Sequence, residues 1–71
     1  MATVDARGLL CPLPLTMAKH RMGQLASGDT LLVMATDPEA AIDLAAWAGE
    51  AGHSFAEHPR EGWAEYALER R

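Results

Sequence analysis

The sequence contains one cysteine, Cys11, followed by Pro12-Leu13-Pro14 at a point where a helix is expected to begin. Free amides at a helix N-terminus carry a partial positive charge, which favours the thiolate and makes sulfur a better nucleophile. With Cys11 as the cap, Pro12 and Pro14 have no N–H to offer, so only the Leu13 amide is expected to meet the sulfur. We therefore predict a mildly activated, accessible thiol that exchanges sulfur with the thiol of a partner protein.

A lone cysteine is also a small hydrophobe, and free cysteines are among the most buried residues. The position at a helix start beside paired prolines favours the reactive interpretation. No second cysteine is present, which excludes an intrachain disulfide, a dithiol redox cycle within one chain and a cysteine-rich zinc site. Three histidines, His20, His53 and His58, match no metal-ligand spacing, so we expect neither a metal nor a cofactor.

Residues on either side of Cys11 are expected to support it. Asp5 and Gly8 are predicted to shape the turn that presents the thiol, with Asp5 as a turn or cap acceptor rather than an acid catalyst. Leu13 and Met17 fall outside the buried stripe of the predicted helix, so they either form a docking surface or pack on a neighbouring loop.

Lys19, His20 and Arg21 form a short basic run on the same predicted helix. They either attract an anionic partner or a persulfide, or form an ordinary solvated face. The sequence leaves these two interpretations open.

Hydrophobic periodicity predicts the elements that position these residues. Leu15, Ala18, Met22 and Leu25 recur at spacings of three and four, which predicts a helix from residue 12 to about residue 25. Asp37 is a capping acid for a second helix, which Gly52 ends. The second helix is expected at 38–51, and strands are expected at 3–5, 30–35, 53–58 and 63–70, with residues 59–62 as a hairpin connection.

This order, β-α-β-α-β-β, predicts an α/β (α+β) two-layer sandwich in which two helices pack on one face of a mixed four-stranded sheet. A right-handed crossover makes the first two strands parallel. The aromatic residues are expected in the core or partly buried on the sheet; they are Trp47, Phe55, Trp63 and Tyr66.

Length and composition limit the function classes. A chain of 71 residues with 49% hydrophobic residues is expected to form a single domain over residues 1–71, with a thin core and as a monomer. Residues 1–35 carry a net charge of +1 and residues 36–71 carry −5, which argues against direct nucleic-acid binding. An odd single thiol, the absence of a signal peptide and the absence of a long apolar run predict a cytoplasmic protein without membrane contact.

Several motifs together resemble the TusA/SirA family of small sulfur carriers over nearly the whole chain. They are Asp5-x-x-Gly8-x-x-Cys11-Pro12-x-Pro14, Gly28-Asp29-x-Leu31-x-Val33, Asp37-Pro38, Asp43-Leu44-x-x-Trp47 and Gly52-His53. Two features depart from the family pattern: Ala45 stands where the family often has proline, and the first helix carries few basic residues.

The resemblance implies the same β-α-β-α-β-β sandwich and a persulfide of sulfane sulfur on Cys11. It implies a cysteine desulfurase or a rhodanese-like protein as donor and a sulfurtransferase as acceptor. The family's pathways include tRNA thiolation, molybdenum-cofactor biosynthesis and the oxidation of reduced sulfur compounds.

Two other interpretations stay open at this point. The chain is alternatively a protein- or RNA-binding regulatory module with an incidental cysteine, or a selenium or redox variant of the same scaffold. A carrier is expected to have a fast-reacting thiol with a lowered pKa, whereas a structural cysteine is expected to be protected until the protein unfolds.

Overall fold

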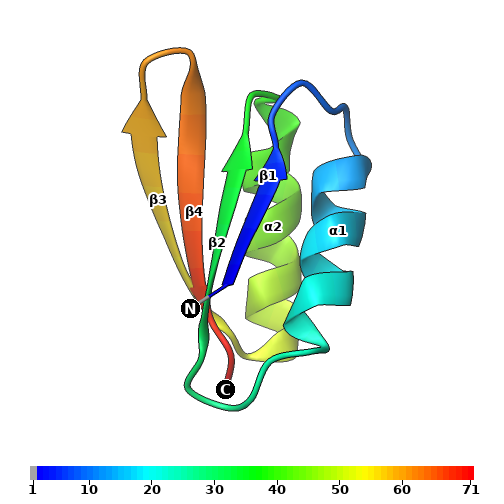
Figure 1. Cartoon of the computed structure of the whole chain (residues 1–71), viewed down its shortest axis with the longest axis vertical. Coiled ribbons are helices and arrows are strands. Elements are labelled where there is room, and N and C mark those ends of the chain that lie inside the picture. Colours follow the sequence, from blue (N-terminus) through cyan, green and yellow to red (C-terminus); the bar gives the residue numbers. More distant parts are fainter. Residues whose placement is uncertain (1) are drawn as a thin grey trace.

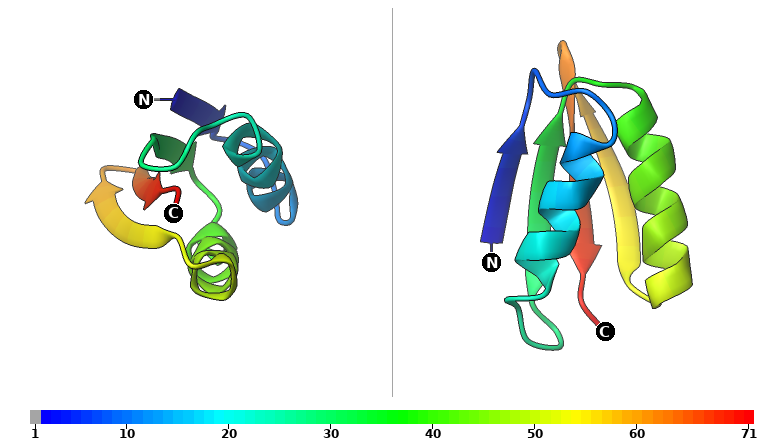
Figure 2. Two further views of the ribbon diagram at one scale, coloured as in Figure 1. Left: turned by 90° about the horizontal axis from the view of Figure 1, so that it is seen from below. Right: turned by 90° about the vertical axis from the view of Figure 1, so that its right-hand side faces the viewer.

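The computed structural model describes residues 2–71, and the elements within them follow the predicted order (Figure 1). They are β1 (Ala2–Ala6), α1 (Leu13–Met22), β2 (Thr30–Ala35), α2 (Glu39–Ala51), β3 (Ser54–Arg60) and β4 (Trp63–Glu69). The sheet order is β1-β2-β4-β3, with β1 parallel to β2 and with β2 and β3 antiparallel to β4. Both helices cover the same face of the sheet (Figure 2), which confirms the predicted two-layer sandwich with a mixed sheet.

The core lies between the sheet and the two helices. Burial alternates along β1 and β2, because successive side chains of a strand point to opposite faces. The helices contribute small inner residues, Ala18, Ala40 and Ala48, around the fully buried Leu44. A fully buried leucine contributes about 2 kcal/mol relative to an exposed one, so a few such residues supply much of the stability of this thin core.

The aromatic residues lie where the sequence places them. Tyr66 is buried, and Phe55 stacks on it with ring centroids 5.8 Å apart. Trp47 and Trp63 are partly buried, Trp47 against the core. Phe55 and Tyr66 extend the apolar layer over β3 and β4.

The first helix is shorter than the predicted span of residue 12 to about residue 25. It begins at Leu13 and ends at Met22, because the glycine that follows is a poor helix former. Arg70, near the other end of the chain, donates from Nη1 to the carbonyls of Met22 and Leu25, both at 2.7 Å. These bonds attach the turn after α1 to the end of β4, and Leu25 still packs against the core.

The hairpin connection between β3 and β4 is also shorter than predicted. β3 continues to Arg60, so the turn is limited to Glu61 and Gly62, and Gly62 has φ +79°. A two-residue hairpin turn favours glycine at such a position. Pro59 is tolerated within β3 because β3 is an edge strand. The remaining element bounds agree with the predicted ones to within one residue at each end.

Both helices begin at the same end of the sandwich. The loop from β1 to α1 and the loop from β2 to α2 lie side by side there, while the start of β1 and the end of β4 lie at the opposite end (Figures 1 and 2). No helix among residues 2–71 is long and apolar enough to cross a membrane.

Candidate functional site

Cys11 lies in the loop between β1 and α1, directly before Pro12. Pro12 is the N-cap residue and Leu13 the first helical residue, so the prediction that Cys11 itself caps the helix is wrong by one position. The Leu13 amide donates to the Leu10 carbonyl at 2.9 Å and is therefore not available to the sulfur. The Cys11–Pro12 peptide bond is cis, and the Cys11 side chain is half-buried.

Two carboxylates from the second half of the chain contact Cys11. The thiol donates a hydrogen bond from Sγ to Oδ2 of Asp43, on α2, at 2.7 Å. The Cys11 backbone N–H donates to Oδ2 of Asp37 at 2.8 Å, and Oδ1 of the same carboxylate accepts the Glu39 N–H at 2.9 Å. The N-cap residue of α2 is Pro38, so Asp37, the predicted cap, lies one position before the observed one; its carboxylate still binds the amide of Glu39, the first residue of α2, and also fixes the backbone of the cysteine loop.

The electrostatic setting of the thiol is the reverse of the predicted one. The hydrogen bond to Asp43, desolvation, and the negative charges of Asp43, Glu39 and Asp37 raise the pKa of Cys11 to about 11. A hydrogen bond from S–H to a carboxylate stabilises the protonated form, and nearby negative charges oppose ionisation. These effects oppose the partial positive charge at the start of α1, so the contacts of Cys11 favour its protonated form, whereas the helix start alone predicts a mildly activated thiol. The amides of Cys11 and Glu39 lower the pKa of Asp37, which keeps that carboxylate charged.

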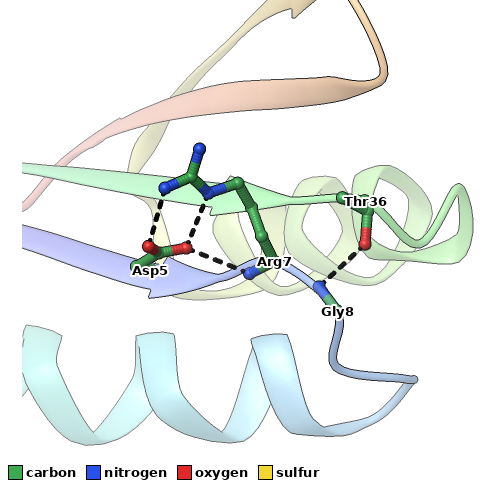
Figure 3. Close-up of polar contacts among 4 residues, drawn as sticks. All are labelled: Asp5, Arg7, Gly8 and Thr36. Atoms are coloured by element: carbon green, nitrogen blue, oxygen red, sulfur yellow. Dashed lines mark hydrogen bonds and ion pairs between the residues drawn. The ribbon is translucent and has the colours of Figure 1, made fainter.

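Asp5 and Gly8 shape the turn that leads to Cys11 (Figure 3). Asp5 accepts hydrogen bonds from the backbone N–H of Arg7 at 3.2 Å and from Nε and Nη2 of its guanidinium, both at 2.9 Å. These bonds hold the pKa of Asp5 at about 2, and its carboxylate is the hydrogen-bond acceptor of this turn. Gly8 has φ +83° and donates its N–H to Oγ1 of Thr36 at 2.9 Å, which joins this loop to the loop before α2.

The two prolines after Cys11 have different surroundings. Pro14 is among the largest fully buried side chains, whereas Pro12 is exposed.

The guanidinium of Arg7 lies 5.2 Å from the centre of the Trp63 ring, on β4, and adds a second attachment of the loop to the sheet. Together with Asp37 and Thr36, these contacts hold the Cys11 loop from both sides.

Exposed apolar side chains lie on both elements that flank the thiol. On the α1 side Leu13 is 48% exposed and Met17 36%, as the docking interpretation requires. Leu10, directly before Cys11, is 73% exposed, and Ile42, directly before Asp43, is 70% exposed. Neither Leu10 nor Ile42 is marked by the periodicity of the sequence, and only their adjacency to Cys11 and to the Asp43 motif is visible there.

The basic run on α1 does not form one patch. Met17, His20 and Arg21 line an open cavity of about 420 Å³ together with Val4 of the edge strand β1. Lys19 lines a different cavity, of about 550 Å³, with Trp47, His53, Arg70 and Arg71. Successive residues of an α-helix point in directions about 100° apart, which separates neighbours in sequence.

The histidines also lie apart. His53 accepts the Arg71 N–H on Nδ1 at 3.3 Å and meets the Trp47 ring edge-on at 5.3 Å, so it has structural contacts. His20 lies on α1 and His58 on β3. Within residues 2–71, no three histidine, cysteine or acidic side chains are grouped so as to hold a metal ion.

Asp43 is the member of the site that sequence reasoning did not assign. The sequence shows it only as part of the Asp43-Leu44-x-x-Trp47 motif. The contact with Cys11 joins positions 32 residues apart, and it depends on how the two helices pack.

Comparison with known proteins places this geometry in a family. The chain is 46% identical over 59 residues to YrkI of Bacillus subtilis, which covers 83% of this chain and 79% of YrkI. It is 42% identical over 59 residues to the sulfur carrier protein TusA of Allochromatium vinosum, with 83% and 78% covered. The crystal structure of a SirA-like protein from Desulfitobacterium hafniense superposes with a TM-score of 0.88 at 25% identity, covering 97% of this chain and 96% of that one. The family model for sulfurtransferase TusA matches residues 2–70, and the chain therefore belongs to the TusA family of sulfur carriers.

Proposed function

We propose that this protein accepts sulfane sulfur as a persulfide on Cys11 and passes it to an acceptor protein. One observation carries the proposal: the single thiol of the chain lies half-exposed in a braced loop at one end of the fold, directly after the exposed Leu10. A thiol with no second cysteine in its chain exchanges sulfur only with another molecule.

The transfer is a pair of exchange steps at sulfur. Cys11 loses its proton, and Sγ attacks the terminal sulfur of a donor persulfide; a new S–S bond forms, the donor S–S bond breaks, and the donor thiolate takes up a proton. In the second step an acceptor thiolate attacks the terminal sulfur of the Cys11 persulfide, and Cys11 is released as a thiol. The sulfane sulfur keeps its oxidation state throughout, so neither an oxidant nor a reductant is consumed.

The apolar side chains around the thiol support docking of the two partners. Leu10, Leu13, Met17 and Ile42 are exposed on the elements that flank Cys11 and Asp43. Exposed apolar residues gathered around a reactive group are typical of a protein-binding surface. The donor in this proposal is a cysteine desulfurase or a rhodanese-like protein, and the acceptor is a sulfurtransferase.

The end uses open to such a relay are tRNA thiolation, molybdenum-cofactor biosynthesis and the oxidation of reduced sulfur compounds. In this proposal the protein acts as a monomeric, single-domain carrier in the cytoplasm. It needs no cofactor and does not touch a membrane or nucleic acid directly. The net charge of −4 supports the last point, because binding to a phosphate backbone requires a basic surface.

Sulfur loading tests the proposal directly. The protein is incubated with a cysteine desulfurase and cysteine, and its intact mass is measured before and after reduction. Wild type should gain the mass of one sulfur atom, which a reductant removes, and Cys11→Ser should gain none. If wild type gains no sulfur, or Cys11→Ser gains as much, the carrier proposal is wrong and a binding module with an incidental cysteine is favoured.

A further inference from the structure

The contact between Cys11 and Asp43 joins the reacting sulfur to a carboxylate on a different element. Sγ lies 2.7 Å from Oδ2, and both side chains are half-buried. A carboxylate is only an acceptor, so this bond exists only while the sulfur carries its proton. The bond therefore stabilises the thiol and not the thiolate.

The surrounding charges act in the same direction. The charged groups that act on the thiol are Asp43 and Glu39 of α2 and Asp37 of the preceding loop, and all three are acidic. Within residues 2–71 the ion pairs join Arg7 to Asp5 and Arg60 to Glu65. Neither pair includes one of the three carboxylates that act on the thiol. The raised pKa of Cys11 agrees with this arrangement.

We propose that Asp43 is a lock on the carrier: by accepting the Cys11 S–H hydrogen bond, it holds the free protein as a slowly reacting thiol until a docked partner displaces or neutralises its carboxylate. The inference rests on the proposed function, because a lock has a purpose only on a sulfur that reacts. Once the bond is lost, Cys11 gives up its proton and attacks the donor persulfide as described above. A locked thiol is also spared from disulfide exchange with small molecules, since the thiolate is the nucleophile.

The rate of alkylation by iodoacetamide, measured against pH, tests the lock. This reagent is small and uncharged, so its reaction reports the thiolate and does not depend on docking or on a sulfur donor. The variant Asp43→Asn keeps the shape of the side chain, removes its charge and places an N–H donor within reach of the sulfur. We expect its pH profile to move to lower pH and its rate at pH 7 to rise at least tenfold, since below the pKa the thiolate fraction changes about tenfold per pH unit.

Glu39→Gln is the matched control. It removes one negative charge from the same helix, but Glu39 acts on the thiol through space, whereas Asp43 also accepts its hydrogen bond. We expect its rate to rise by less than about threefold, because a charge without direct contact is screened by water and salt. Asp43→Ala provides a second variant without any acceptor, and circular dichroism establishes that each variant is folded.

The two proposals fail in different ways. If the alkylation profiles of the Asp43 variants coincide with that of wild type, or if Glu39→Gln moves the profile as far, the lock is refuted while sulfur loading of Cys11 still stands. If loading fails but the profiles move as expected, the thiol is locked without being a carrier, and the proposed function is refuted instead.

Discussion

The backbone N–H of Cys11 and the backbone N–H of Glu39 donate to the two oxygens of one carboxylate, that of Asp37, at 2.8 and 2.9 Å. The first of these bonds spans 26 positions of sequence. A single side chain thus holds both the start of α2 and the backbone of the reactive loop. The relative position of Cys11 and Asp43 depends on this joint, because the two residues belong to the two segments that it connects.

Asp37→Ala should lower the midpoint of thermal unfolding by several degrees, since it leaves two amides without their acceptor. Asp37→Asn keeps one side-chain oxygen, so its unfolding midpoint should lie between those of Asp37→Ala and wild type. Thermal melts followed by circular dichroism measure the effect. Glu50→Ala, which removes the same charge from the last turn of α2, is the control and should leave the midpoint unchanged or raise it slightly. Equal melting of Asp37→Ala and wild type would contradict the bracing role.

Gly8→Ala should destabilise the protein by about 1–2 kcal/mol, because alanine is strained at φ +83°. An added Cβ at Gly8 has no atom within 4 Å, so the penalty is conformational and not steric. Gly49→Ala is the matched control: an added Cβ there also meets nothing, but the residue lies within α2, where alanine is favoured by about 0.5–1 kcal/mol. Denaturant titration should therefore move the two variants in opposite directions, and a shared direction would contradict the assignment.

The Asp5–Arg7 pair should make the stability depend on pH on the acid side. The pKa of Asp5 is held at about 2 by Arg7, below the value of about 3.9 for an unfolded chain. A lowered pKa contributes stability that is complete above the unfolded value and is lost as pH falls through the folded one. The difference in melting midpoint between wild type and Asp5→Asn should therefore shrink from pH 4 to pH 2.

The pair is exposed, so the pH effect should be small and should weaken further in high salt. Melts at low and high ionic strength provide this check. A difference between the two proteins that stays constant from pH 4 to pH 2 would mean that the ion pair makes no net contribution to folding.

Leu10→Ser and Leu13→Ser should each slow sulfur loading by a desulfurase about five- to tenfold, because burying an exposed leucine against a partner contributes roughly 1–2 kcal/mol. Both side chains are exposed, so stability should change little. The rate of iodoacetamide alkylation should stay within about twofold of wild type, which separates docking from reactivity. Ser27→Ala, in the loop at the opposite end of the fold, is the control for loading; if it slows loading as much, the docking surface is not where we place it.

The order of elements could be predicted because its signals are local. The apolar run at 30–35, the spacing of Ala18 and Met22 and the stop at Gly52 each depend on a few neighbouring residues. The end of α1 was predicted less well, because the apolar spacing continues to Leu25 although Gly23 ends the helix, and Arg70 from the far end of the chain binds the carbonyls of Met22 and Leu25. The bond is a tertiary contact and has no counterpart in the periodicity of α1.

The candidate site shows the same division. The position of Cys11 and the turn at Asp5 and Gly8 could be read from short motifs. The protonation of the thiol could not, because the sequence displays the helix start that favours a thiolate but not the carboxylate of Asp43, which lies 32 positions away. The carboxylate of Asp43 therefore opposes the activation of Cys11 that the neighbouring residues alone predict.

The directions of the strands place the first residue of β1 and the last residue of β4 at the end of the sandwich remote from the cysteine loop (Figure 1). A label, a surface anchor or a fused domain joined at either terminus therefore leaves the face around Cys11 free. Immobilisation through the C-terminus should present the thiol outward, toward an incoming protein, in a uniform orientation. The same geometry allows copies of this unit to be joined in series with every thiol accessible.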